Sequence, residues 1–138
     1  MEKKVTSVEQ LFDAAKSAAD NAYAPYSKFR VGAAVECSDG QLVAGCNVEN
    51  ASYGLTICAE RNAIAAAVAQ GHQNFERIVI YTPLKQFVPP CGACRQVIAE
   101  FLPKQAEVVL MNGEGKQKQY TVEQMLPAAF EPESLERD

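Results

Sequence analysis

The chain has 138 residues, 48% of them hydrophobic, and a formal net charge of -4 from 17 acidic and 13 basic residues. This length is enough for one hydrophobic core and too short for two ordinary domains, so we predict a single domain over residues 1–138. No segment rich in lysine and arginine is present to bind a phosphate backbone, which argues against a nucleic-acid partner.

Neither an export signal nor a membrane segment is recognisable in the chain. The two lysines near the start are not followed by an apolar stretch, and the run of small apolar residues at 63–69 is far too short to cross a bilayer. We therefore expect a soluble, cytoplasmic protein with no membrane partner. In such a protein an odd number of cysteines favours metal or redox chemistry over a disulfide framework. The five cysteines are Cys37, Cys46, Cys58, Cys91 and Cys94.

Residues 7–26 predict the first helix. Apolar residues recur at helical spacing there, Ser7 is suited to cap the first turn, and Pro25 is suited to end the helix. Two strand-like runs follow. They are joined at Asp39 and Gly40, a dipeptide typical of tight hairpin turns. The first third of the chain therefore predicts a helix and a β-hairpin.

The middle of the chain predicts two helices on either side of a strand. The first of these helices is expected to begin at Cys58 and to end at Gly71. Residues 77–83 have the apolar composition of a strand buried inside an α/β sheet. Residues 91–102 then predict another helix, which Pro103 stops.

The last part of the chain completes the predicted sheet. Residues 106–111 predict a strand, residues 112–117 a turn, and residues 119–122 a short strand before a short C-terminal helix. The order of elements indicates an α/β fold with a single mixed β-sheet flanked by helices. The charged tail, about residues 131–138, is expected to fray.

The segment PPCGACRQ, residues 89–96, places Cys91 and Cys94 three positions apart where a helix opens. Side chains at that spacing share one helix face, so both thiols can bind one metal ion. The unpaired backbone N–H groups and the dipole at a helix N-terminus favour the thiolate form.

Cys58 occupies the same kind of place on its own helix, in the segment TICAERNAI. Two parallel helices that start at the same edge of a sheet bring Cys58 together with Cys91 and Cys94. Three protein ligands on zinc leave a fourth position for water, which is the arrangement of a catalytic site.

Glu60 and Arg61 follow Cys58 directly along this helix. A carboxylate two residues beyond a ligand can lean over the open metal position without ligating. Glu60 is therefore predicted to take a proton from water and to pass it to the substrate. Because three thiolates outweigh the charge of Zn²⁺, some compensation is needed. We expect it from the helix N-termini and from Arg61, which can hydrogen-bond a ligand sulfur.

These motifs resemble the small, cysteine-ligated cytidine deaminases. The pattern C-A-E followed by P-C-x-x-C is the base-deaminase signature with cysteine in place of the usual histidine. The segments YSKFRVGAAV and GCNVENASYGLTICAERNAI are also similar to that family, and the likeness covers nearly the whole chain. The resemblance implies a cytidine deaminase-like three-layer sandwich. It also implies zinc-dependent hydrolytic deamination of cytidine and deoxycytidine to uridine and deoxyuridine in pyrimidine salvage.

The resemblance assigns roles to particular residues. It implies zinc on Cys58, Cys91 and Cys94, charge compensation by Arg61, and proton transfer by Glu60 to N3 and then to the departing amino group.

The resemblance also implies a nucleoside pocket shared between subunits. Phe29 packs on the pyrimidine ring, Asn47 and Glu49 hold the ribose hydroxyls, and the backbone near Ala59 reads the base edge. Because a carboxylate at the sugar end repels phosphate, a nucleoside is expected as substrate and not a nucleotide. Three further residues reach neighbouring subunits' sites in a homotetramer: Ala51, Tyr53 and Phe130.

Other interpretations of the cysteines remain open at this stage. A thioredoxin-type redox motif would use Cys91 and Cys94 but leaves Cys58 and Glu60 unexplained. A structural zinc site needs a fourth ligand, and the only histidine, His72, is expected at an exposed helix end. Deamination of a different amino-heterocycle is the nearest alternative activity.

Each remaining site residue also has an ordinary structural explanation. Cys37 and Cys46 are expected to be small buried hydrophobes in the hairpin strands. Phe29 alone would be a core aromatic, and Phe130 could pack on its own subunit. Asn47 and Glu49 could stabilise a turn, and Arg61 could be a solvated helix residue.

Overall fold

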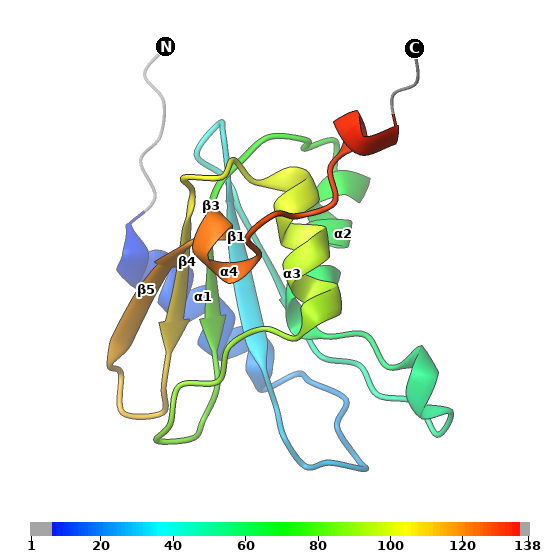
Figure 1. Cartoon of the computed structure of the whole chain (residues 1–138). Coiled ribbons are helices and arrows are strands. Elements are labelled where there is room, and N and C mark those ends of the chain that lie inside the picture. Colours follow the sequence, from blue (N-terminus) through cyan, green and yellow to red (C-terminus); the bar gives the residue numbers. More distant parts are fainter. Residues whose placement is uncertain (1–6, 136–138) are drawn as a thin grey trace.

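The computed structural model describes residues 7–135, which form one five-stranded sheet with helices on both faces (Figure 1). The strands are β1 Gly32–Cys37, β2 Leu42–Cys46, β3 Phe75–Tyr81, β4 Glu107–Met111 and β5 Gln117–Thr121. The helices are α1 Val8–Ala19, α2 Ala59–Ala69, α3 Gly92–Phe101 and α4 Val122–Met125, with 3₁₀ turns at Tyr53–Leu55 and Pro132–Leu135. The predicted α/β fold with a mixed sheet is confirmed.

The sheet has the strand order β2-β1-β3-β4-β5. Only β3 and β4 pair in parallel, and α3 makes the crossover between them. The other neighbouring strands are antiparallel. The carboxyl end of a parallel strand is where α/β folds place their ligands, so the end of β3 is the first place to look for a site.

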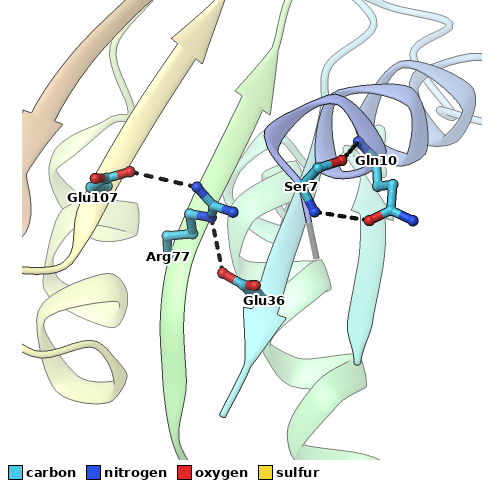
Figure 2. A network of polar contacts seen from close by, with 5 residues as sticks. All are labelled: Ser7, Gln10, Glu36, Arg77 and Glu107. Carbon is cyan, nitrogen blue, oxygen red and sulfur yellow. Dashed lines mark hydrogen bonds and ion pairs between the residues drawn. The ribbon is translucent and has the colours of Figure 1, made fainter. Parts of the chain in front are cut away.

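Helix α1 begins with a reciprocal capping arrangement (Figure 2). The Ser7 hydroxyl accepts a hydrogen bond from the Gln10 backbone N–H, and the Gln10 side chain accepts one from the Ser7 N–H. The helix ends at Ala19, well before Pro25, so the proline is not its stop. Ala19 is the last member of the buried stripe that starts at Leu11.

The two faces of the sheet bury separate apolar clusters. Helix α1 covers one face, where Leu11 and Ala15 pack against Ala34 and Val79. Helices α2 and α3 cover the other face, where Ile64 packs in the same cluster as residues of β1, β3 and β4. These three layers match the predicted sandwich.

Close backbone approach at two glycines holds the helices against the sheet. A Cβ atom on Gly32 would lie 1.8 Å from the Ala15 carbonyl oxygen of α1. One on Gly45 would lie 2.5 Å from the Ala63 backbone nitrogen of α2. No side chain fits at either position, so α1 and α2 pack directly on the hairpin strands.

An ion-pair network crosses the three central strands (Figure 2). Arg77 of β3 stands opposite Glu36 of β1 and Glu107 of β4 in the strand register. Its Nε atom lies 2.9 Å from a Glu36 carboxylate oxygen and its Nη1 atom 3.7 Å from one of Glu107. Opposite charges directly across neighbouring strands favour this register over a slipped one.

Part of the charged C-terminal tail forms a short turn, and whether the tail frays stays a prediction. Residues Pro132–Leu135 form a 3₁₀ turn, and the Lys104 ammonium lies 3.1 Å from a Glu131 carboxylate oxygen. The rest of the tail, residues 136–138, lies outside the described residues.

Candidate metal centre and active site

Three cysteine sulfurs meet where α2 and α3 begin. The Sγ atoms of Cys58, Cys91 and Cys94 all lie within 4.8 Å of one another, and those of Cys58 and Cys91 are 3.8 Å apart. Cys58 is the N-cap residue of α2 and Cys91 that of α3, while Cys94 is buried in the first turn of α3. The predicted meeting of the three thiols at two helix N-termini is confirmed.

The spacing and chemistry of this cluster fit a zinc ion. Two sulfurs bound to one tetrahedral zinc at about 2.3 Å lie roughly 3.8 Å apart. Hydrogen bonding from Cys94, with further support from Arg61 and Cys91, lowers the pKa of Cys58 to about 5. The same pairing with Cys58, together with burial, raises the pKa of Cys94. One thiolate thus forms readily in this cluster, and the remaining thiol protons must leave when a cation binds.

Arg61 reaches the cluster from one turn along α2. Its Nη2 atom lies 3.7 Å from Cys58 Sγ and 3.4 Å from the Thr56 carbonyl oxygen. Its Nε atom is buried and has no hydrogen-bond partner among the described residues. The guanidinium therefore places positive charge beside a ligand sulfur, where the sequence predicts it.

Glu60 lies beside the sulfurs and is almost completely buried, with 4% of its surface exposed. Burial raises the pKa of its carboxyl group, and the negative charge of Cys58 adds to the effect. A raised pKa makes a carboxyl group better able to hold a proton and to pass it on. This is the property required of the predicted proton carrier.

A cavity of about 310 Å³ opens over the cluster at the carboxyl end of β3. Its volume suits a small organic ligand. The lining residues are Ser27, Phe29, Val31, Asn47, Glu49, Thr56, Cys58, Ala59, Glu60, Ile80, Thr82, Val88, Pro89 and Cys91. Every predicted pocket residue of the chain's own subunit, Phe29, Asn47, Glu49 and Ala59, is among them.

The two residues predicted to hold a sugar also organise the pocket wall. Asn47 accepts a hydrogen bond from the Val31 N–H at 2.9 Å and donates one to the Phe29 carbonyl at 2.8 Å. One N–H of the Asn47 amide is left for a ligand. The Glu49 carboxylate accepts hydrogen bonds from the Ser27 hydroxyl and from the backbone N–H groups of Ser27 and Tyr26.

The hydrogen bond from the Ser27 hydroxyl is the main cause that lowers the pKa of Glu49. The carboxylate is therefore charged when it faces the cavity. Negative charge at this end of the pocket favours hydroxyl groups as partners and disfavours phosphate.

Three predicted residues do not reach the cavity of their own chain. Tyr53 is 74% exposed and its ring lies 5.9 Å from that of Tyr26, and Ala51 is exposed nearby. Phe130 is 58% exposed, and its carbonyl oxygen accepts a hydrogen bond from the Gln96 side chain at 2.9 Å. Their predicted place in a neighbour's site remains a prediction.

Sequence reasoning missed three polar residues of the cavity, Ser27, Thr56 and Thr82. Thr82 is 2% exposed, and its Oγ1 atom has no hydrogen-bond partner among the described residues. It is the first residue after β3, and that position was the available signal. Ser27, which holds Glu49, had no such signal because the two residues are 22 positions apart.

The alternative roles of the cysteines fit the structure less well. Cys91 and Cys94 share their cluster with Cys58, and none of the five cysteines forms a disulfide. His72 lies with Cys37 and Asp39, apart from the three sulfurs, so it supplies no fourth ligand there. Cys37 is fully buried, as predicted, whereas Cys46 is only partly buried.

A cluster of three cysteine thiols beside a buried carboxyl group, at the helix-bearing edge of an α/β sheet, fits a hydrolytic metalloenzyme. Residues 5–111 match the family described as the cytidine and deoxycytidylate deaminase zinc-binding region. The chain belongs to this family, which confirms the family expected from its motifs.

Known proteins support this assignment along most of the chain. The cytidine deaminase of Halalkalibacterium halodurans is 46% identical over 127 residues, which cover 92% of this chain and 96% of that protein. That of Sporosarcina psychrophila is 46% identical over 128 residues, covering 93% and 94%. The crystal structure of cytidine deaminase from Burkholderia pseudomallei is 46% identical, with a TM-score of 0.87 over 91% of this chain and all of that one.

No helix among residues 7–135 has the length and apolar character needed to cross a membrane.

Proposed function

We propose that this chain is a zinc-dependent cytidine deaminase that hydrolyses cytidine and deoxycytidine to uridine and deoxyuridine in pyrimidine salvage. The observation that carries the proposal is the buried Glu60 carboxyl group in the same cavity as the three-thiol cluster. The family match and the 46% identity to proteins named cytidine deaminase support it.

The chain's own residues divide the reaction between metal binding and proton transfer. Cys58, Cys91 and Cys94 would hold Zn²⁺, which would supply an acidified water for attack at C4 of the base. Glu60 accepts one proton and delivers it to N3. It then moves a second proton to the exocyclic amino group, which leaves as ammonia. Burial raises the pKa of Glu60, which favours its role as a proton carrier.

Substrate orientation comes from the other end of the cavity. Phe29 supplies an aromatic face for the pyrimidine, and the backbone at Ala59 reads the base edge. Asn47 and the charged Glu49 hold the ribose hydroxyls. The negative charge of Glu49 makes a nucleoside the substrate, because a nucleotide would bring phosphate close to this carboxylate.

The active enzyme is proposed to be a homotetramer with shared sites. The exposed rings of Tyr53 and Phe130 support this, since large exposed aromatic side chains are enriched at interfaces. Ala51, beside Tyr53, would belong to the same contact. Residues 1–138 form one cytidine deaminase-like domain in this proposal. The unpaired thiols of the metal cluster suit a reducing compartment, which supports a cytoplasmic location.

Ammonia release from zinc-loaded protein tests the proposal. The panel contains cytidine, deoxycytidine, CMP, cytosine and amino-substituted purine nucleosides. Turnover of the two cytosine nucleosides, with CMP and free cytosine much poorer, is expected. If another amino-heterocycle is turned over faster than cytidine, that compound is the substrate and the assignment of cytidine is wrong. Protein that holds no zinc but carries a disulfide between Cys91 and Cys94 would favour thiol–disulfide exchange.

A further inference from the structure

A second group of ligand-type side chains lies at the opposite end of the sheet from the cavity. The Sγ atom of Cys37, a carboxylate oxygen of Asp39 and a ring nitrogen of His72 all lie within 4.8 Å of one another. The Sγ atoms of Cys58, Cys91 and Cys94 also lie within 4.8 Å of one another. Residues far apart in sequence thus bring three kinds of metal donor together outside the catalytic site.

The two clusters occupy opposite ends of helix α2. Cys58 caps the start of this helix, whereas His72 follows its end. Eleven helical residues at about 1.5 Å each separate them by roughly 16 Å. Cys37 is the last residue of β1 and stands opposite Phe75, the first residue of β3. The cavity lies at the other end of β3, after its last residue. The second cluster is therefore not part of the catalytic cavity.

The backbone holds all three residues in place. In the hairpin turn, the Cys37 N–H donates to the Gln41 carbonyl at 2.8 Å. The Asp39 Oδ1 atom accepts from the Gln41 N–H at 3.0 Å, which leaves Oδ2 directed elsewhere. The His72 N–H donates to the Ala67 carbonyl at 3.0 Å, closing the end of α2. The fold thus fixes the backbone of Cys37 and His72 and one carboxylate oxygen of Asp39.

The contacts among the three side chains leave room for a cation. Asp39 Oδ2 and His72 Nδ1 are 3.8 Å apart, which is too far for a hydrogen bond but within an ion-pair distance. Burial and the negative charges of Asp39 and Glu36 raise the pKa of Cys37 to about 11. The Asp39 carboxylate, which opposes a bare thiolate, attracts a cation, whereas Glu36 is already paired with Arg77. Binding therefore forms a metal–sulfur bond while the thiol proton leaves to solvent.

We propose that Cys37, Asp39 and His72 form a second metal site, selective for divalent cations of the zinc class. One thiolate, one imidazole and one carboxylate are a donor set that Zn²⁺ and Co²⁺ accept, whereas Mg²⁺ and Ca²⁺ prefer oxygen ligands alone. Asp39 is 51% exposed in its side chain, so water completes the coordination from the solvent side. The ion links the β1–β2 turn to the segment between α2 and β3.

Zinc titration by calorimetry tests this site in protein that already carries one zinc per chain. One further equivalent is expected to bind to the wild-type protein. Cys37→Ser, Asp39→Asn and His72→Gln should each weaken this step by more than about tenfold, the smallest loss typical of even an outer-shell partner. Cys46→Ser is the matched control, because Cys46 lies in the same hairpin outside the cluster, and it should bind like wild type.

A second measurement covers the risk that Cys37→Ser disturbs the core. His72 lies in a surface segment, so His72→Gln should keep the far-ultraviolet circular dichroism of the parent. Co²⁺ added to the one-zinc protein should produce sulfur-to-metal charge-transfer absorption, which His72→Gln weakens and Cys46→Ser leaves unchanged. No second equivalent, or affinities within about twofold of wild type in all three cluster variants, would mean an adventitious ion only and overturn the site.

Discussion

The guanidinium of Arg61 lies 3.7 Å from the sulfur of Cys58, one turn back along α2. Because this contact offsets the excess negative charge of three thiolates, we expect Arg61→Gln to weaken zinc binding by about 10–100-fold. Competition with a chromophoric chelator measures the change. Arg61→Lys should recover part of the affinity, because lysine keeps the positive charge but lacks the planar guanidinium with its several N–H donors. Equal zinc affinity in wild type and Arg61→Gln would show that Arg61 does not stabilise the bound metal.

Replacement of Glu60 separates proton transfer from metal binding. Glu60→Gln should retain one zinc per chain and a wild-type fold, because the carboxyl group is not a ligand. Its kcat should fall by about 10²–10⁴-fold, the usual loss for a general acid-base group. Glu100→Gln, an exposed glutamate on α3, serves as the control and should be silent. Turnover of Glu60→Gln within a few-fold of wild type would refute the role.

The pH dependence of binding reports on the hydrogen bond between Ser27 and Glu49. This bond lowers the folded-state pKa of Glu49, so the carboxylate stays charged to lower pH than a free glutamate, whose pKa is about 4.3. Cytidine binding should therefore weaken only as the pH falls below that value.

In Ser27→Ala the acid limb of 1/KM should move to higher pH, because the Glu49 pKa rises when its main partner is lost. Ser52→Ala is the control, since Ser52 lies outside the cavity lining. Steady-state kinetics between about pH 3.5 and 6.5 cover the window on both sides of an ordinary glutamate pKa. Superimposable acid limbs for wild type and Ser27→Ala would contradict the link.

Removal of the unpartnered hydroxyl of Thr82 should affect stability and binding in opposite directions. A buried hydroxyl without a partner costs about 1–3 kcal/mol, so Thr82→Val should raise the Tm of the ligand-free protein. If Oγ1 faces the bound nucleoside, the same change should raise KM more than it lowers kcat. Thermal melting and steady-state kinetics test both halves. A lower Tm with unchanged KM would show that the hydroxyl has a structural partner.

Complementation tests whether sites are shared between subunits. Mixed tetramers of Glu60→Gln and Phe130→Ala chains should contain some sites with both wild-type residues. Activity after subunit exchange should therefore exceed that of either parent. Light scattering should report a tetramer for both variants. A fully active monomer would remove the shared site and leave the proposed chemistry of Glu60 unaffected.

The catalytic centre was predictable because its signals are short in sequence. Cys58 and Glu60 are two positions apart, Cys91 and Cys94 are three apart, and both pairs stand where a helix begins. Local spacing and helix geometry determine which side such groups face, so no knowledge of the rest of the chain is needed. The strand and helix pattern was predictable for the same reason, since hydrophobic periodicity is a local property.

Only the tertiary structure decided which distant residues become neighbours. The hydrogen bond from the Ser27 hydroxyl to Glu49 and the meeting of Cys37 with His72 had no local signal. Each depends on strand register and on how closely α2 approaches the hairpin. These are set by the whole core at once, because one slipped residue in a strand would turn every side chain to the opposite face.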